Sequence, residues 1–247
     1  MQTVALTLFR FAGLPARLWA FSQMGLSRPR LARLPDLEFF KMFGTGTGEG
    51  FTPIPNFSVY GLMTVWPDLD TARHRIAEAR VFDRYRAVSS ETCSLFLSAV
   101  SSRGAWDGKA PFGTETSLPR APLAVLTRAT LRMPALRSFW SHVPGIEGTI
   151  RQEIEGPLLF KIGMGEVPWL QQVTFSIWRS ETEMVKFAYH SQHHREAIRQ
   201  VRDGDWFREE LYARFAVTGA EGDWEGKALA ERLKPTPTPQ EAISSFA

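Results

Sequence analysis

The feature that most constrains this fold is an internal repeat. The segment GAWDGKA, from Gly104 to Ala110, returns as GDWEGKA from Gly222 to Ala228, 118 residues later. A second echo, 117 residues apart, pairs Gly46, Gly48 and Glu49 with Gly163, Gly165 and Glu166. Matching segments that keep their order along the chain are typical of an internal duplication.

The expected secondary structure repeats in step with these residues. Runs of β-branched and aromatic residues predict strands over Thr3–Phe11, Leu37–Phe43, Phe57–Trp66 and Thr92–Val100. Helices are expected over 18–34, interrupted by Pro29, and over 68–86, with Asp68 as a cap. The second half predicts strands over Leu123–Leu131, Leu158–Gly163, Val173–Trp178 and Leu211–Val217, and helices over 135–152 and 181–202. Strand, helix, strand, strand, helix, strand is the order of a ferredoxin-like unit.

We therefore predict an α+β protein made of tandem ferredoxin-like halves, 1–118 and 119–232. The proline-rich stretch 233–247 is expected to be a disordered tail. Each four-stranded sheet carries its helices on one face and leaves the other bare. Two such sheets close on each other as a dimeric α+β barrel formed within one chain. The gap between a sheet and its helix layer suits a large, flat or elongated apolar ligand.

Composition narrows the class of protein. Cys93 is the one cysteine in 247 residues, so no disulfide forms within the chain, and its apolar neighbours predict a buried, inert thiol. No run approaches the ~20 apolar residues of a membrane-spanning helix.

The first acid after an early basic stretch is Asp36. That stretch is either a solvated helix face or a contact for phosphates of lipid or nucleic acid, and it contains Arg10, Arg17, Arg28, Arg30 and Arg33. Since no nucleic-acid-binding motif accompanies it, we expect no nucleic-acid partner.

Several common catalytic motifs are missing. The glycine cluster Gly44–Gly50 lacks a following Gly-Lys-Ser/Thr, so it indicates a structural hairpin rather than a phosphate loop. No Gly-x-Ser-x-Gly motif is present. The acidic pairs Glu209–Glu210 and Asp203/Asp205 lie beside arginines and are expected to be ion-paired surface groups.

Three histidines lie together on the helix expected over 181–202. At about 100° per residue, His194 falls in the middle of an apolar stripe and faces inward. His190 lies at the edge of that stripe, and His193 lies on the flank. The apolar members of the stripe are Phe187, Ile198 and Val201.

An inward histidine is either a hydrogen-bonded core residue or a metal ligand. Zinc requires three or four ligands, and the chain offers no cysteine cluster to complete such a set. Haem needs a single protein ligand on one side and an apolar wall for the porphyrin. The surroundings of His194 therefore suit haem better than zinc.

Four segments, taken in order, resemble the spheroidene monooxygenase family, the acyclic carotenoid 2-ketolases of purple phototrophic bacteria. The resemblance runs from about Gln2 to Lys227. The segments that carry it are TLFRF…LWAFSQMGL, GTGTGEGFTPIPN, GAWDGKAPF and FAYHSQHHREAIRQVRDGDWFREELYARF.

The resemblance implies a haem enzyme that uses dioxygen and reduced ferredoxin. Its carotenoid substrate, spheroidene or hydroxyspheroidene, is hydroxylated twice at C-2 and then dehydrated to a ketone. The axial-ligand role falls on His194, with His190 as the alternative, and Phe187 and Ile198 line the cofactor. Arg214 and Trp178 are expected either in the pocket or in strand-end packing and an exposed ion pair.

We expect a cytoplasmic protein with peripheral contact to the photosynthetic membrane, through Trp19, Phe21 and Met24 beside Arg17 and Arg28. Two other classes remain open: a cofactor-free monooxygenase on the same barrel, and a non-catalytic haem or carotenoid carrier.

Overall fold

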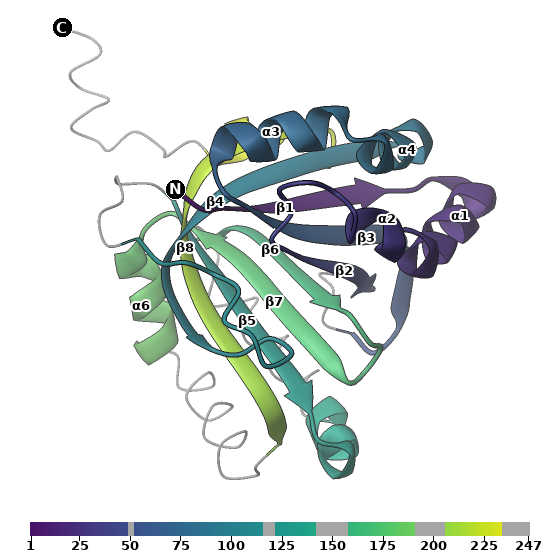
Figure 1. The fold of residues 1–247 in the computed structure, drawn as a ribbon. Coiled ribbons are helices and arrows are strands. Elements are labelled where there is room, and N and C mark those ends of the chain that lie inside the picture. Colours follow the sequence, from purple (N-terminus) through teal and green to yellow (C-terminus); the bar gives the residue numbers. More distant parts are fainter. Residues whose placement is uncertain (49–51, 116–121, 142–157, 191–205, 234–247) are drawn as a thin grey trace, which may run out of the picture.

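The computed structural model describes residues 1–48, 52–115, 122–141, 158–190 and 206–233 (Figure 1). Its strands are β1 (Thr3–Arg10), β2 (Phe39–Gly46), β3 (Pro55–Trp66), β4 (Glu91–Gly104), β5 (Leu123–Leu131), β6 (Leu158–Gly165), β7 (Gln171–Trp178), β8 (Phe207–Trp224) and β9 (Lys227–Ala228).

These strands join into one antiparallel sheet in the order β4-β1-β3-β2-β6-β7-β5-β8-β9. A further pairing between β4 and β8 closes the first eight strands of that order into a barrel. The predicted closed barrel is therefore confirmed. Within it, β1 to β4 lie in the order β4-β1-β3-β2, and β5 to β8 lie in the corresponding order β8-β5-β7-β6.

The two seams between these groups of strands differ in length. Strands β4 and β8 pair from Cys93↔Gly222 to Gly104↔Leu211. Strands β2 and β6 pair only at Gly44↔Gly165 and Thr45↔Met164. Both β4 and β8 extend past the predicted ends, Val100 and Val217, because each serves as the other's pairing partner over that extra length.

The helices are α1 (Gly13–Leu26), α2 (Arg28–Leu31), α3 (Leu69–Glu78), α4 (Arg80–Val88), η1 (Met133–Ala135), α6 (Glu181–His190) and α8 (Leu229–Arg232). Helical backbone continues after η1 over 136–141, and the rest of the helix predicted over 135–152 lies outside the described residues.

Two of the predicted helices are each broken. The one expected over 18–34 begins earlier, at Gly13, and its predicted interruption is confirmed. The break falls at Ser27, because Pro29 has no N–H for a helical hydrogen bond. The one expected over 68–86 is interrupted at Ala79, whose backbone is extended. The predicted cap is confirmed, since Asp68 accepts a hydrogen bond of 2.7 Å from the Thr71 N–H.

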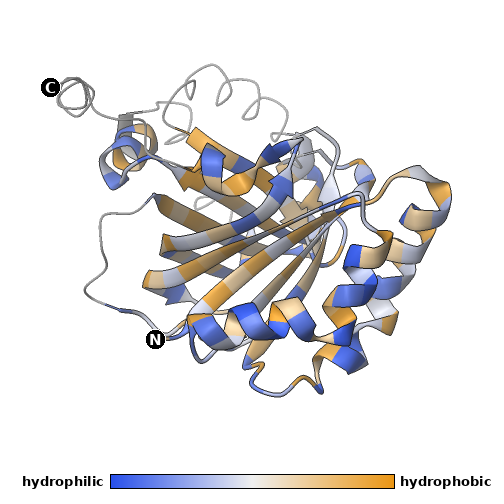
Figure 2. Cartoon of the chain, turned by 90° about the horizontal axis from the view of Figure 1, so that it is seen from above, coloured by the Kyte–Doolittle hydropathy of each residue, from blue (hydrophilic) through white to orange (hydrophobic). Residues whose placement is uncertain are grey.

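The apolar core has an inner and an outer part. Side chains from every one of β1 to β8 fill the barrel interior, among them Leu6, Phe43, Leu97, Leu126 and Phe175. A second cluster lies between the outer face of β1 to β4 and the helices α1 to α4, and includes Phe9, Trp66 and Phe82. Figure 2 shows the hydrophobic residues concentrated along the strands. Cys93 is buried in the barrel interior, as the sequence predicted.

Leu233, which the sequence assigned to the tail, is buried in the inner cluster. The packed chain therefore extends through this residue, and the tail beyond it lies outside the described residues. In the described part of the chain, no helix has the length and apolar character needed to cross a membrane.

Gly104 is a position where the fold requires glycine. Its φ is +99°, and an added Cβ would overlap the carbonyl oxygen of Glu210 on β8. We expect Gly104→Ala to lower the free energy of unfolding by more than about 1 kcal/mol. The control is Gly25→Ala in α1, where a Cβ meets no atom within 4 Å; helix propensity predicts a gain of up to about 1 kcal/mol there. Urea unfolding of both variants checks this, and equal stabilities would contradict the packing.

Candidate functional site

The helix that carries the histidines packs on the second group of strands. Helix α6 has Glu181 and Glu183 in its first turn, where carboxylates favour the helix N-terminus. Phe187 faces inward and stacks on Trp178, with ring centroids 5.1 Å apart and planes 29° apart. His190 is the last residue of α6, and the structure does not describe its side chain. His193, His194 and Ile198 lie outside the described residues.

An apolar wall lies beneath α6. Leu123, Trp178 and Met184 are buried in it, with partly buried side chains packed around them from β5, β6 and α6: Val125, Leu158, Val185 and Phe187. The indole N–H of Trp178 donates a hydrogen bond of 2.9 Å to the Ser176 hydroxyl, so this polar group is satisfied without leaving the wall. The contact between α6 and the strands is therefore apolar and leaves no unpaired indole N–H at Trp178.

The two further pocket candidates have different surroundings. Trp178 is 4% exposed beneath α6 and stacks on Phe187, which is the strand-end packing that the sequence left open as its alternative. Arg214 instead forms an exposed ion pair with Glu181, at 3.1 Å between guanidinium nitrogen and carboxylate oxygen. This is the exposed ion pair that the sequence left open as the alternative for Arg214.

The matching position on the first group of strands is closed by helices. Trp66 ends β3 as Trp178 ends β7, and it is fully buried under the helical layer. Phe82 of α4, which precedes His194 by 112 residues as Trp66 precedes Trp178, is also fully buried. The outer face of β1 to β4 therefore offers no space for a ligand at this point.

Each GxWxGKA segment forms a tight hairpin that begins with its tryptophan. Trp106 and Lys109 exchange backbone hydrogen bonds of 2.8 and 3.1 Å around Asp107 and Gly108. Both turn residues have positive φ, 50° and 73°, as a two-residue type I′ turn requires. Trp224 pairs with Lys227 in the same way, around Glu225 and Gly226 with φ of 56° and 71°.

A buried charge cluster surrounds Trp106. Its indole N–H donates to Glu166 at 2.6 Å, and Glu166 also pairs with Lys41 at 2.8 Å. Arg128 of β5 is fully buried and donates to Glu209. Asp107 links the two parts of the cluster, since it pairs with both Lys41 and Arg128. Glu209, which the sequence assigned to an ion-paired surface, is therefore the partner of a fully buried arginine.

A related set of contacts holds Trp224. The guanidinium of Arg10 lies 4.6 Å from the centroid of the Trp224 ring and pairs with Glu91 at 2.6 Å. Glu91 accepts a hydrogen bond of 2.8 Å from the Gly226 N–H, just as Glu209 accepts one of 2.8 Å from the Gly108 N–H. Arg10 is 34% exposed at its side chain, whereas Arg128 is 0% exposed.

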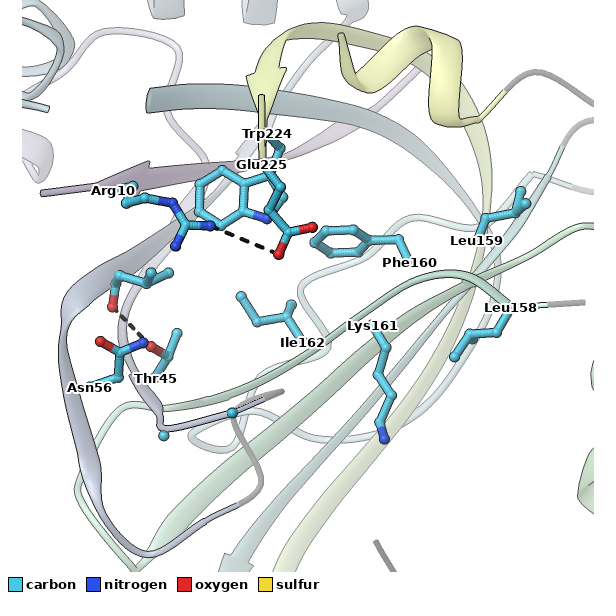
Figure 3. Close-up of a pocket in the computed structure, with 13 residues that line it drawn as sticks. Arg10, Thr45, Asn56, Leu158, Leu159, Phe160, Lys161, Ile162, Trp224 and Glu225 are labelled. Carbon is cyan, nitrogen blue, oxygen red and sulfur yellow. Dashed lines mark hydrogen bonds and ion pairs between the residues drawn. The ribbon is translucent and has the colours of Figure 1, made fainter. Parts of the chain in front are cut away.

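A cavity of about 270 Å³ opens beside Trp224, where β2 and β6 part. In Figure 3, Phe160 and Ile162 of β6 point towards Trp224 and Arg10, whereas Lys161 between them points the other way. Thr45 and Asn56 line the side formed by β2 and β3. The cavity has both apolar walls and polar rims, and the short β2–β6 seam leaves room for it.

The charge cluster around Trp106 makes stability depend on pH. Burial alone raises the pKa of Glu209, but hydrogen bonds from Gly108 N–H, Arg128 and Asp107 N–H outweigh it, so the pKa lies below its usual value. The pKa of Asp107 is lowered too, because Lys41 and Arg128 outweigh its burial.

Because both pKa values are depressed in the folded state, we expect their stabilisation to be complete above the unfolded-state values of about 4. It is lost as the pH falls through the lower folded-state values. Urea unfolding of the wild type and Glu209→Gln at pH 7 and at a series of pH values from about 4 down to about 2 measures this. The loss on acidification is expected to be smaller in Glu209→Gln, and an equal loss would contradict the assignment.

Among the described residues, no group of three or more histidine, cysteine, aspartate or glutamate side chains is placed to hold a metal ion. The His190 side chain and His194, which the sequence favours as ligands, lie outside the described part of the chain.

Comparison with known proteins decides the family. The spheroidene monooxygenase of Cereibacter sphaeroides is 44% identical to this chain, over 98% of the chain and 76% of the relative. That of Rhodobacter capsulatus is also 44% identical, over 92% of the chain and 95% of the relative. The chain belongs to the spheroidene monooxygenase family. The Rubrivivax gelatinosus member is 32% identical, over 86% of the chain and 81% of the relative. No protein-family model matches the chain.

Membership in the spheroidene monooxygenase family confirms the resemblance of the four segments and makes this chain a monooxygenase. Solved structures agree on the fold. An aldoxime dehydratase matches 96% of this chain and 89% of its own length at a TM-score of 0.57 and 11% identity. A second aldoxime dehydratase, solved with butyraldoxime, matches 87% of this chain and 79% of its own at a TM-score of 0.57 and 9% identity. At these identities the likeness concerns the fold alone.

Proposed function

We propose that this chain is a haem-dependent carotenoid monooxygenase that introduces a keto group at C-2 of spheroidene or hydroxyspheroidene. The observation that carries the proposal is its 44% identity, over nearly the whole chain, to two enzymes named spheroidene monooxygenase. Dioxygen is the oxidant and reduced ferredoxin the electron donor. Two hydroxylations of one CH₂ group give a gem-diol, and loss of water from the gem-diol leaves the ketone.

The described residues fit one wall of a haem site. Trp178, Leu123 and Met184 form a buried apolar surface beneath α6, and the polar atom of Trp178 is satisfied by Ser176. His194 would hold the haem iron, with His190 as the alternative, and Phe187 and Ile198 would flank the porphyrin. Haem held in this way would supply the reductive activation of dioxygen.

The protein's own contribution is to exclude water and to hold the polyene. Stacking of Phe187 on Trp178 keeps one side of the site dry, because both rings lie against the buried face of β5 and β7. A long apolar substrate gains binding energy all along its length. That binding energy can fix one CH₂ group near the reacting centre.

The same proposal takes the barrel as two ferredoxin-like halves, 1–118 and 119–232. The strand orders β4-β1-β3-β2 and β8-β5-β7-β6 support it. So does a constant separation of 118 residues between elements with matching contacts: Arg10 and Arg128, Glu91 and Glu209, Gly104 and Gly222, Trp106 and Trp224. In this view the two halves share a scaffold, and only the second carries the histidine cluster His190, His193 and His194.

The proposal is tested by the absorption spectrum and turnover of the purified chain. A Soret band, together with formation of the 2-ketone from spheroidene only when dioxygen and a reductant are present, is the expected result. Haem without turnover would indicate a carrier. Turnover by a protein without a Soret band would indicate a cofactor-free monooxygenase, and either result would overturn the proposal.

A further inference from the structure

Helix α1 is apolar on two opposite sides. At about 100° per residue, Leu14, Leu18 and Phe21 fall within about 60° of one another and form one stripe. Ala20 and Gln23 lie on the opposite side and are buried against the outer cluster of the barrel. A helix that already buries one face gains nothing within the fold from a second apolar stripe, so the outer stripe needs another explanation.

The outer stripe lies open on the surface. Leu14, Leu18 and Phe21 are 68%, 60% and 59% exposed. Phe57 of β3 extends the same surface, since its ring centroid lies 5.8 Å from that of Phe21 and it is 50% exposed. We call these four residues the apolar face. Contiguous exposed apolar side chains of this size mark an interaction surface.

The charges beside the apolar face are positive. No aspartate or glutamate occurs between residues 1 and 35. The arginines of α1, α2 and the turn after them are exposed and form no ion pair with a described acid: Arg17, Arg28, Arg30 and Arg33. Arg28 and Arg30 donate instead to the Met24 and Leu26 carbonyls of α1, at 3.0 and 2.8 Å, which holds both guanidinium groups beside this helix.

We propose that the apolar face docks on an anionic lipid bilayer. Its aliphatic and aromatic side chains enter the headgroup boundary, while the arginines meet lipid phosphates and carboxylates. Charge favours this partner over a second copy of the chain. In a two-fold dimer the same surface faces itself, so the arginines of the two copies would lie against each other.

The apolar face and the cavity at the β2–β6 seam lie at the same end of strands β1 and β3. Arg10, which lines the cavity, is three residues before the start of α1 and pairs with Val59 of β3, and Asn56, which also lines it, is the sequence neighbour of Phe57. Docking of the apolar face therefore places this end of the barrel near the lipid surface. The suggestion that this placement serves the uptake of a carotenoid dissolved in the membrane rests on the proposed function. The binding of the apolar face to lipid does not rest on it.

The test is flotation of the purified full chain with vesicles of phosphatidylcholine alone or mixed with phosphatidylglycerol. We expect binding to the mixed vesicles, weakened by high salt, because surface charge is then screened. The double variant Leu18→Ser/Phe21→Ser is expected to bind at least about tenfold more weakly, since two large apolar side chains are removed. The matched control is Val100→Ser/Met133→Ser, two exposed apolar residues outside the apolar face, and it is expected to bind as the wild type does.

Failure of the wild type to float with mixed vesicles would overturn the proposal, as would equal loss of binding in the control. A wild-type dimer in analytical ultracentrifugation that the Leu18→Ser/Phe21→Ser variant converts to a monomer would reassign the face to a second copy. Turnover of detergent-dispersed spheroidene by the wild type is measured in parallel. Vesicle binding without turnover contradicts the proposed function only, and turnover without vesicle binding contradicts the docking only.

Discussion

A His194→Ala variant is expected to be purified without haem. In the proposed function His194 holds the iron, so its removal would leave the iron without a protein ligand, and the described side chains of the apolar wall beneath α6 include no histidine to replace that bond. The measurement is the Soret absorbance per protein chain, compared with the wild type prepared in parallel. His190→Ala is expected to keep most of its haem, because His190 falls at the edge of the apolar stripe rather than in its centre.

The matched control for these variants is His74→Ala. His74 lies on α3, is exposed, and pairs only with Glu78 one turn further along the helix, at 3.4 Å. Its loss is expected to leave haem content unchanged. Full retention in His194→Ala together with loss in His190→Ala would move the axial role to His190. Retention of haem in both variants would show that neither His190 nor His194 is the iron ligand.

An Arg128→Met variant is expected to lose about 2–3 kcal/mol of unfolding free energy, the upper part of the range for hydrogen bonds to charged groups. Arg128 is fully buried, and its removal deprives Glu209 and Asp107 of a guanidinium that they share. The loss stays below that of a fully buried ion pair because the two carboxylates are 21% and 52% exposed at their side chains. Glu166 also loses a cation 3.9 Å away, although Lys41 still pairs with it. Urea unfolding at pH 7 measures the change.

The chain supplies its own control for this change. Arg10→Met removes the counterpart arginine at the Trp224 end, where the side chain is partly exposed and pairs with Glu91. We expect a loss of only about 1 kcal/mol there, because solvent screens the pair. Equal losses of unfolding free energy in the two variants would contradict the claim that the burial of Arg128 makes its ion pairs contribute more to stability than those of Arg10.

The repeat made most of the fold predictable from sequence. Each GxWxGKA segment contains the Asp-Gly or Glu-Gly pair that a type I′ hairpin needs, and each falls after a strand that the apolar pattern also indicates. The ends of β4 and β8 were not predictable in this way. Their extra length depends on pairing with each other across the barrel, and that pairing leaves no local pattern.

The charge cluster around Trp106 was missed, although the sequence held a signal for it. Arg10 and Arg128, like Glu91 and Glu209, are separated by 118 residues, the same interval as the two hairpins. Local reasoning placed Glu209 on an ion-paired surface because arginines flank it. Its actual partner is Arg128, distant in sequence and brought to it by the pairing of β5 with β8.

The histidine helix was predictable only in its first turns. Glu181 and Phe187 lie where the helical pattern puts them, at the start of α6 and on its inward side. The roles of His190, His194 and Ile198 stay predictions, since they depend on residues or side chains that the structure does not describe.

The central claim, that this chain oxidises an acyclic carotenoid at C-2, is tested most directly by product analysis under oxygen-18 gas. Purified protein, spheroidene and a ferredoxin reducing system are mixed and quenched rapidly, before the carbonyl exchanges with water. The account predicts a 2-ketone that carries the isotope and that is absent when dioxygen is withheld. Unchanged spheroidene in a haem-loaded, reduced sample, or a ketone formed without dioxygen, would contradict it.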